Sequence, residues 1–261
     1  MALCFKPVHE LYGAEVHGLD LSAPLDEYAI EQIRKGLDEY AVLVFRDQPL
    51  TDEQQAAFTR YLGGGKLEGK VKRAESGLKF DLGAELSSAP LKISNVGDKE
   101  EILGKNDPRR MSKLGNRLWH NDGCVTNPIT RYTILSGRIV PPVRADTQFA
   151  DTRAAYDALD GWLKEQVRDL FVSYSVFYAR NSLGFEIASE EADQLPQAEH
   201  KLVQYLSETN REALFLGQHA SHVVDWPIPE GRVLLYQLTE HATQPQFIYC
   251  PSSGFLGQQA A

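Results

Sequence analysis

His120 and Asp122 are the two residues of this chain whose types and spacing best suit chemistry. On an extended strand, side chains two positions apart point to the same side, so this imidazole and carboxylate would converge. A neutral imidazole and a carboxylate are two of the three ligands in the facial triad that holds non-haem Fe(II). The pair therefore predicts a metal site whose open face accepts a co-substrate and dioxygen.

His-x-Asp is a short motif that recurs by chance, so the pair also has a plain structural interpretation. His120 would then make a local hydrogen bond, and Asp122 would cap a turn. Cys124, two residues further on, is a soft donor that could join a metal site, but a packed small hydrophobic side chain is the interpretation we favour. Trp119 would help to exclude water from a metal site.

Longer segments elsewhere in the chain strengthen the metal interpretation. They are Val42-Leu43-Val44-Phe45-Arg46-Asp47-Gln48-Pro49-Leu50, residues 128–137, 141–149 and 151–159, Gly217-Gln218-His219-Ala220-Ser221-His222-Val223, and Glu240-His241-Ala242-Thr243-Gln244. Together with the His-x-Asp motif they resemble the Fe(II)/2-oxoglutarate-dependent dioxygenases of the taurine and 2,4-dichlorophenoxyacetate dioxygenase family, most closely its phenoxyacetate branch. The resemblance spans about residues 8 to 249, which makes it specific.

The resemblance implies roles for several residues beyond the two metal ligands. Thr147, which is 27 residues past His120, would donate its hydroxyl to the distal carboxylate of 2-oxoglutarate, although a β-branched strand residue is the structural alternative. Asn116 would contact the substrate near iron. Lys70 and Lys72 lie where the phenoxyacetate branch has a lysine suited to an anionic substrate, although lysines in a polar loop are usually only solvated.

His219 and His222 are two imidazoles three residues apart in an otherwise polar segment, which we interpret as a turn. We expect one of them to face the substrate cavity. The cofactors implied by the resemblance are Fe(II) and, as co-substrate, 2-oxoglutarate. The implied activity is hydroxylation of a small anionic organic substrate, phenoxyacetate-like or sulfonate-like, with dioxygen.

The length, the hydrophobic content and the net charge indicate which kinds of partner the protein can have. A chain of 261 residues with 43% hydrophobic content can bury a full core, and its net charge of −9 argues against nucleic acid or an anionic membrane as partner.

No apolar run approaches the roughly 20 residues of a membrane span, and the start lacks a secretory pattern, so we expect a cytoplasmic protein. Three scattered cysteines form no disulfide framework. A homo-oligomer is compatible with the sequence.

The periodicity predicts a single domain over residues 1–250. Helices are expected over 27–39, from Thr51 to Gly63, as a pair over 152–170 with Asp151 as N-cap, and over 230–243. Strands are expected over 41–45, 91–96, 131–139, 147–150, 172–178, 213–216 and 246–250. The polar section 66–117 is a candidate lid over the active site. The resemblance implies a mainly β fold with flanking helices, the double-stranded β-helix or jelly-roll, lacking its last strands.

The tail, residues 251–261, departs from the family pattern. No histidine follows His241, and no lysine or arginine follows Arg232, whereas the family places its third metal ligand and its 2-oxoglutarate-binding arginine there. We therefore expect a tail without a strand and little turnover by this chain. The alternative to an enzyme is a catalytically inactive truncated isoform or remnant that acts as a binding protein.

Overall fold

The computed structural model describes the chain in six stretches. They are residues 3–63, 93–97, 100–139, 146–188, 192–251 and 259–260. Lys70 and Lys72, and much of the expected lid, lie outside these residues. None of the described helices is long and apolar enough to cross a membrane.

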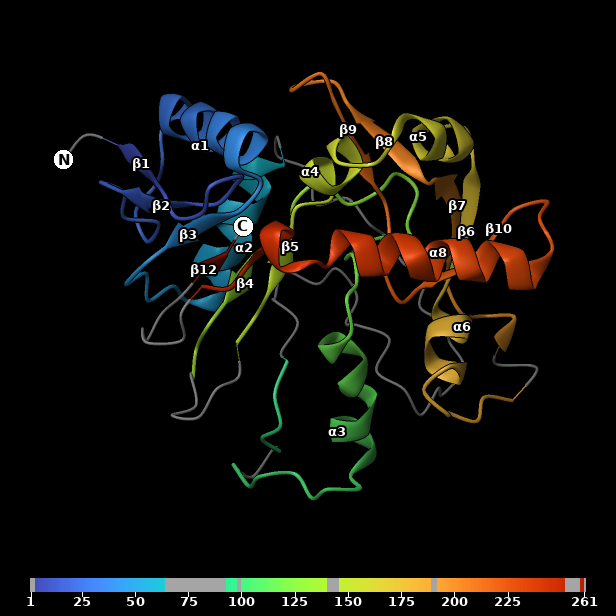
Figure 1. Cartoon of the computed structure of the whole chain (residues 1–261). Coiled ribbons are helices and arrows are strands. Elements are labelled where there is room, and N and C mark those ends of the chain that lie inside the picture. The colour runs from blue at the N-terminus through green and yellow to red at the C-terminus, as the bar shows by residue number, and fades with distance from the viewer. Residues whose placement is uncertain are drawn as a thin grey trace.

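The N-terminal part is a small sheet covered by two helices (Figure 1). Strand β1 (Cys4–Pro7) pairs antiparallel with β2 (Ala14–His17), and β2 pairs parallel with β3 (Leu43–Phe45). The parallel pair needs a crossover, and helix α1 (Glu27–Tyr40) provides it. The predicted helix at 27–39 and the strand after it are thereby confirmed.

Both N-terminal helices begin at side-chain caps, of which the second was predicted from the sequence. Asp26 accepts a hydrogen bond from the Ala29 backbone N–H at 2.7 Å at the start of α1. Helix α2 (Asp52–Leu62) begins with the predicted reciprocal capping box between Thr51 and Gln54, and it ends at Gly63. The apolar faces of both helices pack on the sheet in one cluster that includes Ile33, Leu43, Phe45 and Phe58.

The end of the chain returns to this sheet. Strand β12 (Gln259–Ala260) lies between β3 and β4 (Leu135–Ser136), so the sheet order is β1-β2-β3-β12-β4. Figure 1 shows the C-terminus beside the N-terminal strands. The expectation of a tail without a strand is wrong at these two residues, because backbone hydrogen bonding to β3 and β4 does not need an apolar side-chain pattern.

The rest of the chain forms smaller sheets packed against helices. Strand β6 (Phe171–Ser175) is the centre of the order β10-β6-β7, with β7 at Gln197–Lys201 and β10 at Ala220–Val223. Strand β8 (Val203–Leu206) pairs with β9 (Arg211–Leu214), and β5 (Phe149–Ala150) pairs with β11 (Ile248–Tyr249).

Five helices and two single turns complete the described elements. They are α3 (Pro108–Ser112), α4 (Thr152–Asp157), α5 (Gly161–Val167), α6 (Val176–Asn181), α8 (Ile228–Ala242), and the 3-10 turns η1 (Leu114–Arg117) and η2 (Pro245–Phe247). Helix α8 crosses the face of the molecule and packs on β10 (Figure 1). It covers the largest core cluster, which contains Val172, Tyr174 and Leu202.

The architecture is therefore mixed rather than mainly β. The described strands form sheets of five, three, two and two strands, and these strands do not close into a barrel. Several expected strands are shorter than predicted. Only Leu135–Ser136 is strand within 131–139, only Phe149–Ala150 within 147–150 and only Ile248–Tyr249 within 246–250. Within the described part of 91–96, only Val96 forms an isolated bridge, to Ile102. The expected strand 172–178 ends at Ser175, where α6 begins.

Candidate metal and substrate site

His120 lies in the irregular segment after η1, and Asp122 begins the turn that follows; neither is on an extended strand as predicted. Their side chains nevertheless converge: the distance between His120 Nε2 and Asp122 Oδ1 is 3.5 Å. The turn brings the two groups together where strand alternation was expected to do so. About a quarter of the imidazole and half of the carboxylate are exposed, so a small ligand can reach both.

The His120 ring is oriented by the backbone. Its Nδ1 lies 2.8 Å from the Leu118 carbonyl oxygen, which can only accept a hydrogen bond, so Nδ1 carries the proton. In that tautomer Nε2, the nitrogen nearer to Asp122, has its lone pair available. A carbonyl that fixes the tautomer in this way is the usual partner of a metal-binding histidine.

Asn121, between the two candidate ligands, anchors the segment to the body of the protein. Its side-chain amide donates to the Leu216 carbonyl oxygen at 2.5 Å, and the Gln218 backbone N–H donates to the Trp119 carbonyl oxygen at 2.9 Å. Asn121 was not among the residues predicted from the sequence. Because His120 and Asp122 on either side of it face the site, the Asn121 side chain was free to point the other way, into the body of the protein, and this could have been anticipated.

Gly217 allows this close contact between residues 119–121 and 216–219. Its φ of +138° is one that side chains with a Cβ rarely adopt, and a Cβ there would lie 2.9 Å from the His120 Cα. Glycine is therefore required twice over, by its backbone conformation and by the approach of another backbone.

His219 lies beside the pair, held by a backbone hydrogen bond from the Ser175 N–H to its carbonyl oxygen at 2.9 Å. Its Nδ1 is buried and has no hydrogen-bond partner among the described residues. Burial lowers the pKa of His219 to about 4; repulsion that would arise from a protonated His120, and repulsion from Arg180, act in the same direction, and the Asp122 carboxylate opposes the shift. His219 is therefore neutral at pH 7 and electrostatically coupled to the pair.

His222 belongs to β10, so the predicted polar turn is wrong for this residue. The Ser221 hydroxyl donates to the Ser173 carbonyl oxygen at 2.8 Å and lies 2.8 Å from His222 Nδ1. These contacts satisfy the hydrogen-bonding capacity of the buried Ser221 hydroxyl. A polar residue can therefore occupy this strand, although its polarity had favoured a turn. His222 is half-buried, and its role toward a substrate remains a prediction.

The other predicted residues lie around or outside this centre. Asn116 is exposed on η1, the turn that leads into His120, and Thr147 is exposed two residues before β5. Their roles remain predictions, as do those of Lys70 and Lys72. Cys124 is only 2% exposed within the main core, and burial raises its thiol pKa to about 12, so it packs as the predicted small hydrophobic residue.

The whole of this region falls within one family match. The model of the family described as "Taurine catabolism dioxygenase TauD, TfdA family" matches residues 5–250. The chain belongs to the TauD/TfdA dioxygenase family. The sequence resemblance to this family is thereby confirmed.

Individual relatives within the TauD/TfdA family are similar along most of their length. The chain is 38% identical over 253 residues to the alpha-ketoglutarate-dependent 2,4-dichlorophenoxyacetate dioxygenase of Cupriavidus pinatubonensis, covering 95% of this chain and 85% of the relative. It is 34% identical over 257 residues to the (S)-phenoxypropionate/alpha-ketoglutarate-dioxygenase of Sphingobium herbicidovorans, covering 95% and 82%. The crystal structure of AAD-2 in complex with Mn(II) and N-oxalylglycine is similar with a TM-score of 0.85 and 35% identity, covering 100% and 87%.

The geometry of His120 and Asp122 fits a divalent metal ion such as this family of dioxygenases would need. Two ligand atoms that each lie about 2.1 Å from one ion are about 3 to 4 Å apart, and the observed separation of 3.5 Å falls in this range. Among the residues that the structure describes, no group of three His, Cys, Asp or Glu side chains could hold a metal ion. The described site thus offers one imidazole and one carboxylate, the two side-chain types that a facial triad uses.

Proposed function

We propose that this chain is an Fe(II)- and 2-oxoglutarate-dependent oxygenase that acts in the cytoplasm on a small anionic organic acid of the phenoxyacetate or sulfonate type. The observation that carries the proposal is the convergence of His120 Nε2 and Asp122 Oδ1, with the histidine tautomer fixed by Leu118. Family membership over residues 5–250 and similarity to 2,4-dichlorophenoxyacetate and phenoxypropionate dioxygenases support it. We propose that the strands of the chain belong to a jelly-roll.

Each residue of the site has a defined part in this proposal. His120 and Asp122 hold the iron, and the Leu118 carbonyl and Asn121 keep the imidazole and its backbone in place. Bound iron with 2-oxoglutarate supplies the oxidising chemistry that hydroxylates a C–H bond. Thr147 donates to the distal carboxylate of 2-oxoglutarate, while Asn116, Lys70, Lys72, His219 and His222 contact the organic substrate.

The test incubates the 261-residue chain with Fe(II), 2-oxoglutarate and 2,4-dichlorophenoxyacetate for long periods. Mass spectrometry then measures how much succinate has formed. We expect slow formation, because two protein ligands make a weaker iron site than three. It should fall by more than about 100-fold in Asp122→Ala and with a chelator. A folded protein that forms no Asp122-dependent succinate would instead support the inactive binding protein.

A further inference from the structure

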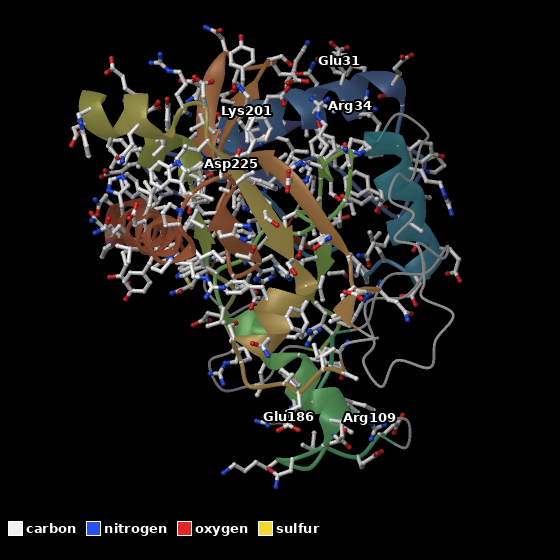
Figure 2. The ribbon with its side chains drawn as sticks, turned by 90° about the vertical axis from the view of Figure 1, so that its right-hand side faces the viewer. Glu31, Arg34, Arg109, Glu186, Lys201 and Asp225 are labelled. Atoms are coloured by element: carbon white, nitrogen blue, oxygen red, sulfur yellow. The ribbon has the colours of Figure 1, made fainter. Side chains whose placement is uncertain are left out.

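The chain enters and leaves the candidate site through two different anchors. It arrives from α3, which carries Arg109 at one end of the molecule (Figure 2), and passes through η1 to His120. The Leu118 carbonyl and the Asn121 amide hold this incoming side. The outgoing side is the turn that begins at Asp122, and a separate set of contacts fixes it.

Thr126 closes this turn by directing both of its hydrogen-bond donors at one carbonyl. Its backbone N–H donates to the Gly123 carbonyl oxygen at 3.1 Å, and its side-chain hydroxyl donates to the same oxygen at 2.7 Å. The hydroxyl oxygen also lies 2.9 Å from the Pro128 carbonyl oxygen. Because a hydroxyl has one proton, the two carbonyls share it, and the contact with Gly123 is the shorter one. Thr126 is thus bonded to the residue that directly follows Asp122.

Gly123 has a backbone conformation that leaves it little freedom. Its φ of +69° lies in the left-handed region that favours glycine. A Cβ at this position would collide with the Thr130 side chain, and it would lie 3.1 Å from the Thr130 backbone nitrogen. The chain therefore doubles back after the turn and packs directly against Gly123.

The Asp122 carboxylate depends on these backbone contacts for its direction. It is about half exposed, and within the part of the chain that the structure describes it forms no hydrogen bond or ion pair except with His120. The middle of the turn, in contrast, is fixed, because Cys124 is 2% exposed in the main core cluster. The backbone on either side of Asp122, rather than a direct side-chain partner, sets where its carboxylate points.

We propose that Thr126 is a positioning residue whose hydroxyl fixes Gly123 and so holds the Asp122 carboxylate where it can share one divalent metal ion with His120 Nε2. This inference rests on the proposed function, since it concerns the metal site of that function. Groups that orient a metal ligand without touching the metal typically change metal affinity by about 10- to 100-fold when they are removed. The rival explanation is that Thr126 only stabilises the fold through its turn.

The experiment is a Mn(II) titration of the isotope-labelled chain, followed by paramagnetic broadening of the Gly217 amide NMR signal. This signal reports on the site because Gly217 lies against the backbone of His120. In Thr126→Val, which keeps the shape of the side chain but removes the hydroxyl, the Mn(II) concentration that halves the signal should rise about tenfold or more. In Thr126→Ser, which keeps the hydroxyl, it should change by less than about twofold. Thr126→Ala, which also lacks the hydroxyl, repeats the test with a smaller side chain.

Thr209→Val is the matched control. In the turn between β8 and β9, the Thr209 N–H and hydroxyl lie 3.2 and 3.5 Å from the carbonyl oxygen of Leu206, three residues earlier, which repeats the arrangement of Thr126 and Gly123. This variant should leave the Mn(II) concentration unchanged. Urea unfolding of every variant separates the two explanations, because a merely structural threonine would lower the free energy of unfolding without changing the metal affinity of the folded protein.

Three results would overturn the inference and leave the proposed function standing. They are a Thr126→Val chain that broadens like the parent, a Thr126→Ser chain as impaired as Thr126→Val, and an equal loss of affinity in Thr209→Val. Asp122→Ala distinguishes the two claims, because it should abolish the selective broadening by itself. If the parent chain shows no broadening that depends on Asp122, the proposed function fails at its metal site, and the role of Thr126 fails with it.

Discussion

Gly217 approaches the backbone of His120 closely, and the free energy of unfolding can show how much a side chain at residue 217 would disturb this contact. Gly217→Ala would force a Cβ to within 2.9 Å of the His120 Cα at a φ of +138°. We expect the free energy of unfolding in urea to fall by about 1–3 kcal/mol. Gly161→Ala is the matched control, because nothing lies within 4 Å of its Cβ position. That control should be neutral or slightly stabilising, and equal effects of the two substitutions would refute the contact.

His219 should make stability depend on pH. In the unfolded chain it takes up a proton near pH 6.5, whereas in the folded protein it does so only near pH 4. Between these values the unfolded state binds more protons, so the free energy of unfolding falls as the pH falls, by up to about 3 kcal/mol. Urea unfolding of the metal-free protein at several pH values measures this effect.

The variant for this test is His219→Gln, which cannot be protonated. Its unfolding free energy should depend less on pH between 6.5 and 4 than that of the parent chain. His17→Gln, which removes an exposed histidine that faces Glu15 at 3.6 Å, controls for the loss of any imidazole. If both variants keep the parent's pH dependence, the buried environment assigned to His219 is incorrect.

The candidate site could be predicted from the sequence only where residues close in the chain cooperate. His120 and Asp122 are two positions apart, so a local turn brings them together, although the extended strand expected to do this is absent. Gly217 enters the site through its close approach to His120, a residue about 100 positions away in the chain, and Asn121 is held by the Leu216 carbonyl at a similar separation. Such contacts depend on how elements pack, and no local pattern encodes them.

At the scale of elements, the junction between α4 and α1 rests on a buried ion pair. Asp151 and Arg153 are nearly inaccessible, and they share two hydrogen bonds of 3.0 Å. The Arg153 Nη1 donates to the Asp38 carbonyl oxygen near the end of α1 at 3.0 Å. The pair thus ties the N-terminal helix to the central part of the chain.

Removing one partner of that pair should be costly. Asp151→Ala leaves a buried guanidinium without its counter-charge and removes the N-cap of α4, so we expect a loss of about 3–5 kcal/mol of unfolding free energy. Asp160→Ala removes only the N-cap of α5 and should cost about 1 kcal/mol. Circular dichroism during urea unfolding compares the two. Similar midpoints for both variants would contradict the structural role of the ion pair.

Helices were predictable here because caps and apolar spacing are local. Asp26, Thr51 and Asp151 each begin the helix that follows them. Strands were less predictable, because β6 and β10 become strands by pairing with distant partners. Ser175 shows the limit: an apolar run continues through it, but its hydroxyl caps α6 and ends the strand.

At the scale of the whole molecule, a net charge of −9 complicates any test of metal binding. Surface carboxylates attract divalent ions weakly and without specificity. The measurement must therefore show where the ion lies and not only that it binds. It must also work for a weak site, since among the described residues His120 and Asp122 are the two proposed ligands.

Titration of the isotope-labelled chain with substoichiometric Mn(II), followed by paramagnetic broadening of its amide NMR signals, meets both needs. We expect the signals of residues 119–122 and 217–219 to broaden first. Asp122→Ala should abolish this selectivity, whereas Asp169→Ala, which removes an exposed carboxylate, should preserve it. Broadening spread over the acidic surface, or selectivity that survives Asp122→Ala, would contradict the metal site.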